Sequence, residues 1–104
     1  MKHDYVTTDT KVWDYLRYPA FLDSTQISNT SKMLYMHLLE KTLRERTEEE
    51  HGFLYTEFPV IEQMKALSRS STTVQHSLLE LERAGLLERR HTGVGRHTRL
   101  YVLF

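Results

Sequence analysis

Apolar residues recur with a helical period well past the middle of the chain. Three of them stand at i, i+4 and i+7, where a helix places its side chains on one stripe, namely Val74, Leu78 and Leu81. Ser70 and Ser71 precede this stripe where an N-cap is needed, and Gly85 follows it where a left-handed residue ends a helix. The pattern therefore predicts a helix with defined ends, closed by an apolar contact between Leu81 and Leu86.

Two β-prone runs follow this helix, residues 86–90 and 99–102, and the loop between them holds Gly93 and Gly95. Two such runs joined by a glycine-containing loop are typical of a hairpin. A shorter segment with apolar residues at helical spacing precedes residue 68. Two helices followed by a basic hairpin are the outline of a winged helix-turn-helix, whose second helix usually enters the DNA major groove.

Residues 28–46 form a second helical pattern. Ser28 is a suitable N-cap, and one stripe of the predicted helix carries Leu34, Leu38 and Thr42. The opposite side is also rich in apolar residues, where a surface helix would be polar: Met33, Met36 and Leu43. This second side needs a cover, which either the preceding aromatic segment or a second subunit supplies.

Residues 47–58 connect the predicted helices. Residues 47–52 contain three consecutive glutamates and are predicted to form a solvated acidic turn rather than a metal site, because consecutive carboxylates do not share one face. Residues 53–58 have a strand pattern, and this strand could pair with the hairpin as its third member. Pro59 suits the first turn of the next helix, which should end near Leu67.

The N-terminal quarter has no helical period. Residues 1–11 are polar and are predicted to be a flexible arm, and residues 12–27 are predicted to be an aromatic segment that packs on the core. Pro19 interrupts any continuous helix there. An aromatic platform for stacking on bases is the alternative, but such platforms are surrounded by basic residues, and only Lys11 and Arg17 are nearby.

Length and composition indicate one domain, residues 1–104, of class α+β, with three main helices and a small antiparallel sheet. The chain has no cysteine, no long apolar run and no secretory signal, so we expect a soluble cytoplasmic protein. Its net charge of zero is unevenly distributed. Residues 1–64 carry a net charge of −4 and residues 65–104 carry +4, so the basic half coincides with the predicted helix and hairpin.

The sequence does not indicate an enzyme. Six histidines are scattered without a His-x3-His pair, and there is no cysteine to complete a zinc site. Neither a nucleophile elbow nor a phosphate-binding glycine loop is present. We therefore expect no metal, no cofactor and no small-molecule substrate.

An ordered set of residues runs along most of the chain, through both helical patterns and the hairpin. It comprises Tyr18-Pro19, Phe21-Leu22, Ser28, 31–35, Leu38-Leu39, Phe58-Pro59, Arg69-Ser70, Thr73-Val74, Leu78, Leu81-Glu82, 84–90, Gly93, Gly95 and 99–102. In this set the chain resembles the N-terminal winged-helix domain of the plasmid replication initiator protein A family of Gram-positive bacteria. It departs from the family at Ser68, where glycine is usual between the helices, and at Arg96, His97 and Thr98 in the wing.

The resemblance implies a domain that binds repeated sites in a plasmid origin, often as a homodimer, to begin replication. Carried over to this chain, the start of the recognition helix falls on residues 70–76 and the wing on residues 89–99. The candidate DNA-binding residues are Arg69, Ser70, Ser71, Thr72, Thr73, Gln75, His76, Arg89, Arg90, Thr92, Gly93, Arg96, His97 and Arg99.

The chemistry of these residues suits double-stranded DNA. Arginines on a hairpin can bind phosphates, and Ser71 and Thr72 suit phosphates at a helix N-terminus. Gln75 and His76 can donate to and accept from base edges, whereas Leu79, which also points outward, is assigned to packing beneath the wing. Two other functions use the same fold: a transcriptional regulator, and a winged helix used only for protein assembly.

Overall fold

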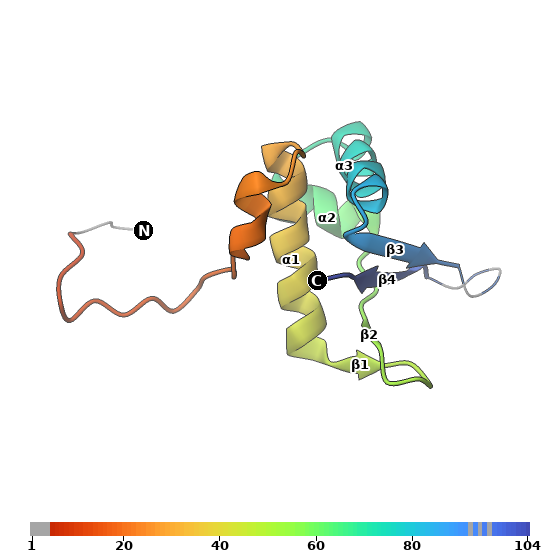
Figure 1. Cartoon of the computed structure of the whole chain (residues 1–104), viewed down its shortest axis with the longest axis horizontal. Helices are drawn as coiled ribbons and strands as arrows, with labels where there is room; N and C mark the ends of the chain where they lie inside the picture. Colours follow the sequence, from red (N-terminus) through yellow and green to blue (C-terminus); the bar gives the residue numbers. More distant parts are fainter. Residues whose placement is uncertain (1–4, 92, 94, 96) are drawn as a thin grey trace.

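Three α-helices and two antiparallel strand pairs make up the described part of the chain, which is residues 5–91, 93, 95 and 97–104 of a computed structural model. In chain order the elements are η1 (Ala20–Ser24), α1 (Asn29–Glu45), β1 (Thr47–Glu48), β2 (Leu54–Tyr55), α2 (Val60–Leu67), α3 (Ser71–Arg83), β3 (Leu87–Arg90) and β4 (Arg99–Val102). Figure 1 shows α2 and α3 beside α1, with the β3–β4 hairpin directly after α3. This is the predicted winged helix-turn-helix of class α+β.

The starts of α1 and α3 are fixed by serine caps, as the sequence predicts. The Ser28 hydroxyl oxygen accepts a hydrogen bond from the Ser31 amide at 3.1 Å, and the Ser70 hydroxyl oxygen accepts one from the Thr73 amide at 3.3 Å. Each bond satisfies an amide that the helix itself leaves without a partner. The first turn of α3 is therefore set by local chemistry, before any tertiary contact.

The ends of α2 and α3 both use a left-handed residue. Gly85 (φ 75°) follows α3, and the Leu86 amide donates to the Leu81 carbonyl at 2.9 Å, which confirms the predicted ending. Ser68 (φ 53°) ends α2, and its amide donates to the Met64 carbonyl. Because left-handed backbone costs a residue with a Cβ about 1 kcal/mol or more, this geometry explains why glycine suits the turn.

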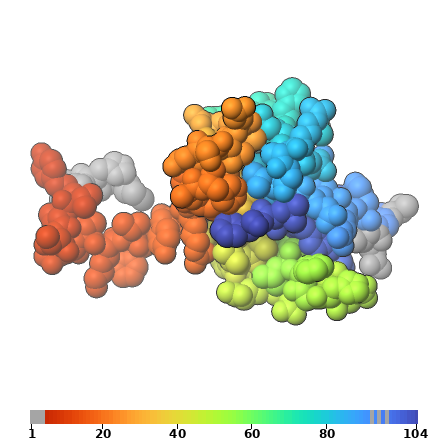
Figure 2. Space-filling view, in the orientation of Figure 1, coloured from red at the N-terminus to blue at the C-terminus, as the bar shows by residue number. Residues whose placement is uncertain are grey.

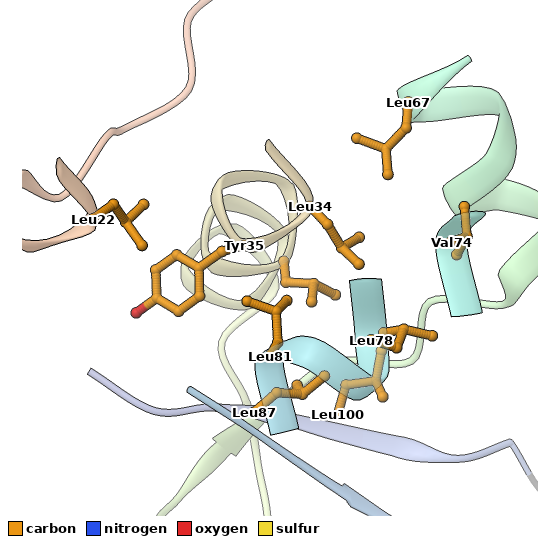
Figure 3. Close-up of a cluster of buried hydrophobic side chains, with 10 residues drawn as sticks. Leu22, Leu34, Tyr35, Leu67, Val74, Leu78, Leu81, Leu87 and Leu100 are labelled. Atoms are coloured by element: carbon orange, nitrogen blue, oxygen red, sulfur yellow. The ribbon is translucent and has the colours of Figure 1, made fainter. Parts of the chain in front are cut away.

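The core lies where α1, α3 and the hairpin meet. Its buried members are Leu22, Leu34, Tyr35, Leu38, Leu67, Val74, Leu78, Leu81, Leu87 and Leu100. Figure 3 shows these side chains converging from the helices and the hairpin, with Leu22 beside the Tyr35 ring. The predicted stripes of α1 and α3 are thus the buried faces of those helices, and Thr42 on the α1 stripe is buried as well.

The strands differ in part from the prediction. β3 and β4 form the expected antiparallel hairpin, with Leu87 opposite Val102 and Arg90 opposite Arg99. The predicted strand at residues 53–58 is shorter, and its two-residue β2 pairs with β1 instead of lying along the hairpin. The backbone pairing with the hairpin is one bridge at the next residue, in which Thr56 and Leu100 exchange two backbone hydrogen bonds of 3.0 and 2.8 Å.

The acidic segment at residues 47–52 is more ordered than predicted. Thr47 and Glu48 form β1, and a Glu49 carboxylate oxygen accepts hydrogen bonds from the amides of His51 (2.6 Å) and Phe53 (3.2 Å). The prediction of a solvated acidic turn is confirmed, since residues 50–52 are exposed and the Gly52 amide donates to the Glu49 carbonyl at 2.9 Å. The Glu49 carboxylate additionally closes this turn between β1 and β2.

The N-terminal segment packs on the core only in its second half. Leu22 of η1 is fully buried, and the Phe21 ring contacts the Tyr35 ring edge-on at 5.8 Å. Trp13 and Tyr15, by contrast, are 84% and 60% exposed. The expected packing of residues 12–27 is therefore wrong for residues 12–15, which project from the domain (Figure 2). Contact with α1 begins at Arg17, which pairs with Glu40 at 2.8 Å. Of the predicted arm, residues 1–4 lie outside the described residues.

The second apolar side of α1 is partly covered by this chain itself. Met36 is half-buried and packs against the core. Met33 remains 38% exposed, and Leu43 lines a groove described below. Both covers considered from the sequence therefore stay open, since one part of this side packs within the chain and another part is exposed.

Candidate nucleic-acid interface

The side of α3 that faces away from the core is a continuous exposed surface. Its members follow the spacing of one helical face, and all of them are exposed: Thr72, Gln75, His76, Leu79 and Arg83. We call this set the outward face of α3. It combines hydrogen-bonding, basic and apolar side chains, which is the mixture that base edges in the major groove require.

The two glutamates of α3 are held to the sides of the helix, away from the outward face. A Glu80 carboxylate oxygen accepts hydrogen bonds from the Ser28 amide (2.8 Å) and the Ser31 hydroxyl (2.6 Å) of α1. These bonds, the one from Ser31 foremost, hold the pKa of the Glu80 carboxyl below its usual value. Glu82 accepts a hydrogen bond from Arg89 Nε at 2.9 Å. The outward face therefore carries no carboxylate that would repel phosphate.

Several candidate residues at the start of α3 are engaged in local hydrogen bonds. Ser70 and Thr73 form the N-cap, in which the two hydroxyls also bond at 3.1 Å. Arg69 Nη1 donates to the carbonyl oxygens of the preceding turn, and Gln75 Nε2 donates to the Ser71 hydroxyl at 3.0 Å. Ser70 and Thr73 are thus explained by helix capping alone, whereas the Gln75 amide is exposed and held over the first turn.

The arginines of the hairpin lie on its two faces. Arg89 is on the face toward α3, where it pairs with Glu82. Arg90 and Arg99 are opposite one another on the other face, where Arg90 lies over the Tyr101 ring (4.5 Å) and pairs with Glu88 at 2.8 Å. In the sequence these arginines look like one basic group. Because successive side chains of a strand point to opposite faces, the hairpin separates Arg89 from Arg90 and Arg99.

Arg99 and its surroundings form a layered contact on this second face. Its guanidinium lies 4.4 Å from the centre of the Tyr55 ring, which in turn lies 5.6 Å from the Tyr101 ring. A hollow beside these side chains is lined by the glutamates of residues 48–50 as well as by Arg90 and Arg99. The acidic segment thus lowers the positive potential on this face of the wing.

A second hollow, of about 540 Å³, lies between the wing and α2. Its lining includes His91, His97 and Thr98 from the hairpin, and the Thr98 hydroxyl lies 3.1 Å from His91 Nδ1. The two hairpin histidines therefore line one hollow, on the side of the wing that also carries Arg89. Gly93 is exposed at the tip. The candidates Thr92 and Arg96 lie outside the described residues.

Two residues of the outward face were not among the candidates selected from the sequence. Arg83 is exposed at the C-terminal end of α3, and its i+11 spacing from Thr72 was the signal that could have identified it. Leu79 was assigned to packing beneath the wing, and that assignment is wrong. It is 39% exposed and is not among the residues packed against the core.

The described residues give no indication of a metal site or of a membrane-spanning helix. Within residues 5–91, 93, 95 and 97–104, His, Asp and Glu side chains do not gather in groups of three or more that could hold a metal ion. No helix in this part of the chain has the length and apolar character needed to cross a membrane. The outward face of α3 and the wing carry exposed hydrogen-bonding and basic side chains.

Comparison with solved structures identifies the same fold. The structure titled "N-Terminal domain of DNA binding protein" has a TM-score of 0.75 and 18% identity, covering 99% of this chain and 85% of that one. "Structure of Rep-DNA complex" also has a TM-score of 0.75 and 18% identity, with 97% and 84% covered. "Structure of MDR initiator" has a TM-score of 0.72 and 18% identity, with 88% and 77% covered.

Sequence comparison is more specific than these structural likenesses. Among curated protein sequences none matches this chain. The family model described as the N-terminus of replication initiator protein A (RepA) matches residues 15–103, which span α1, α2, α3 and the hairpin. The chain therefore belongs to the replication initiator protein A N-terminus family.

Proposed function

We propose that this replication initiator domain binds double-stranded DNA with sequence preference, with α3 placed in the major groove. The observation that carries the proposal is the outward face of α3, where hydrogen-bonding and basic side chains are exposed and both glutamates of the helix are held aside. A major groove about 12 Å wide accepts one helix, and its base edges present donors, acceptors and methyl groups. The role is binding rather than catalysis.

The first turn of α3 would contact the phosphate backbone. Helix N-termini bind phosphate because their unpaired amides and the helix dipole both favour negative charge. Ser71 and Thr72 lie in that turn, and Arg69 precedes it with its side chain folded over the α2–α3 turn. These contacts fix the register of the helix on the duplex, and Gln75 and His76 then lie one turn further along, where they can reach base edges.

The wing would contact the neighbouring phosphates. Arg89 lies on the hairpin face toward α3, so it is the described wing arginine best placed to reach DNA bound by α3. Its pairing with Glu82 holds the guanidinium in place before binding, and a phosphate would compete with Glu82 for it. Arg90 and Arg99 lie on the other face and act more weakly, because the acidic segment is beside them.

Membership of the replication initiator family supports a proposal about where the DNA target lies. We place the target in the origin of a plasmid or mobile element in the cytoplasm, as repeated sites recognised by several copies of the domain. Selection of bound sequences from random duplexes tests this setting, because an origin-binding domain should return a motif that recurs in tandem beside its own gene. A palindromic operator would instead indicate a transcriptional regulator.

Substitutions should separate base reading from phosphate binding. We expect Gln75→Ala or His76→Ala to relax the preference at one or two base positions, since a good base contact discriminates by about 1 to 3 kcal/mol. Arg89→Ala should weaken all sequences alike and reduce the salt slope by about 1, because phosphate contacts carry little sequence information. Arg99→Ala should act in the same way but more weakly, because Arg99 lies on the other face of the wing beside the acidic segment. Affinities for the selected site, single-base variants and random duplex give both quantities.

Lys32→Ala is a matched control for these variants, because Lys32 lies on α1 outside the proposed interface. It should change neither base preference nor the salt slope by more than experimental error. Wing variants that alter base preference, combined with helix variants that alter only overall affinity, would reverse the two assigned roles.

We also propose that two copies associate through the projecting aromatic segment. A groove of about 750 Å³ is lined mostly by apolar side chains of α1, the β1–β2 turn and the C-terminal residues, among them Leu43 and Phe53. The same chain exposes Trp13 and Tyr15 on a segment that projects from the domain. Exposed apolar area on this scale favours association, and the segment of one copy has the chemistry to fill the groove of the other. This segment and the wing lie on opposite sides of α1 (Figure 1), so both could act at once.

Trp13→Ser should weaken self-association by about tenfold or more, as loss of a buried aromatic anchor does, without affecting the fold. Sedimentation over a concentration series measures the effect. Leu43→Glu, which changes the groove instead of the segment, should act in the same direction, whereas Ile61→Ser, which removes an exposed apolar side chain of α2, should have no effect. A wild-type chain that stays monomeric at high concentration would contradict the proposal.

A further inference from the structure

Leu79 stands out on α3 because it is an exposed leucine in the middle of a polar surface. The other leucines of the helix, Leu78 and Leu81, are 2% and 0% exposed, whereas Leu79 is 39% exposed. Gln75 and Arg83, both exposed, lie one turn before it and one turn after it. Packing therefore accounts for Leu78 and Leu81 but leaves the exposed part of the Leu79 side chain without a structural role.

The position of Leu79 along α3 is within reach of base edges. It lies eight residues after the first residue of the helix, Ser71, which is about 12 Å along the axis at 1.5 Å per residue. The side chains on either side of it along the same face, Gln75 and Arg83, are of types that contact bases or phosphates. A duplex that accepts these neighbours on the outward face would also meet Leu79.

The chemistry of leucine limits what it can recognise there. Its side chain neither donates nor accepts hydrogen bonds, so placing it against a polar base edge would remove water from that edge without compensation. The major groove offers one apolar group, the C5-methyl of thymine. We propose that Leu79 contacts a thymine methyl in the bound duplex and specifies an A·T pair at that step. This inference rests on the proposed major-groove binding by α3.

Deoxyuridine tests this contact, because it keeps the base pairing and hydrogen-bonding groups of thymine and lacks only the methyl group. Each thymine of the selected site is replaced singly by deoxyuridine, and the affinity of the wild-type domain is measured. We expect one replacement to weaken binding about fourfold, the factor that corresponds to one buried methyl group. The Leu79→Ala variant should bind the site less tightly and should not distinguish thymine from deoxyuridine at that step.

Two further variants control the measurement. Gln75→Ala should weaken binding yet keep the fourfold methyl dependence, because it changes a different contact on the same face. Leu79→Met, which retains an apolar side chain, should keep part of that dependence. Alanine is a better helix former than leucine, and Leu79 is exposed, so the variant should fold normally, as circular dichroism can verify.

The outcomes separate the inference from the proposed function. If no deoxyuridine replacement weakens wild-type binding, the thymine contact is absent although sequence-specific binding stands. If Leu79→Ala keeps the full methyl dependence, another residue reads the methyl group and the assignment to Leu79 is overturned. If the wild-type domain binds no duplex, or binds all duplexes equally, the proposed function fails and the inference fails with it.

Discussion

The affinity of the domain for its duplex site is expected to fall about 250- to 1,000-fold as monovalent salt rises from about 50 to 200 mM. Four to six phosphate contacts give a log-log slope of about −4 to −5, since each releases condensed counterions from DNA. A chain with zero net charge would not suggest such a slope, but residues 65–104 carry +4 and form most of the proposed interface. Fluorescence anisotropy at four or five salt concentrations measures the slope.

Glu82 provides an internal check on this prediction. Glu82→Gln should raise the affinity for all duplexes, because it removes a negative charge beside the interface and releases Arg89 from its ion pair. Glu40→Gln makes the same change in net charge on α1, where Glu40 pairs with Arg17, and should have little effect. Binding that does not depend on salt, or equal effects of the two substitutions, would show that the proposed local field is absent.

Glu80→Ala is expected to destabilise the fold by about 2 to 3 kcal/mol, because hydrogen bonds to a charged group are strong and their loss leaves polar partners unsatisfied. The Glu80 carboxylate joins α3 to the start of α1 through the Ser28 amide and the Ser31 hydroxyl, and Ser31 is fully buried. Urea denaturation with an unchanged m-value measures the difference in free energy of unfolding. Because the same contact sets α3 against α1, the variant should also bind DNA less tightly.

The pH dependence of this contribution has a definite sign. The pKa of the Glu80 carboxyl is lowered in the folded protein, chiefly by the Ser31 hydroxyl and next by the Ser28 amide. A group with a lowered folded pKa stabilises the fold above its ordinary pKa of 4.5, and that stability is lost as the pH falls through the folded pKa. The stability difference between wild type and Glu80→Gln should thus be complete at neutral pH and should shrink below about pH 4.5.

Glu40→Ala is the matched control for stability, because it removes an exposed ion pair with Arg17 and should cost less than about 1 kcal/mol. The assignment of Glu80 would be wrong if its substitution cost no more than this control. It would also be wrong if the difference between wild type and Glu80→Gln stayed constant from neutral to acidic pH.

The sequence by itself determined the helices, their ends and the hairpin, because these depend on neighbours within a few positions. The Ser28 and Ser70 caps and the Gly85 ending each involve groups no more than five residues apart. Period and spacing likewise identified the buried stripes of α1 and α3. The family resemblance was also available from the sequence, since it depends on the order of these local features along the chain.

Partners that are distant in sequence decided the rest. Residues 53–58 have the pattern of a strand, but their partner β1 lies in an acidic segment that was predicted to be a turn. Only the fold shows that β2 pairs with β1 and not along the hairpin. The sequence does not show that Glu80 bonds to Ser28, 52 residues away, or that Arg89 and Arg90 lie on opposite faces of the wing. Whether a side chain is buried also depends on partners that are distant in sequence. The pattern of apolar residues does not distinguish a leucine that packs against the core from one that is exposed to solvent. Leu79 and Trp13 are exposed because no other described part of the chain covers them, which is a property of the assembled elements and not of any one of them.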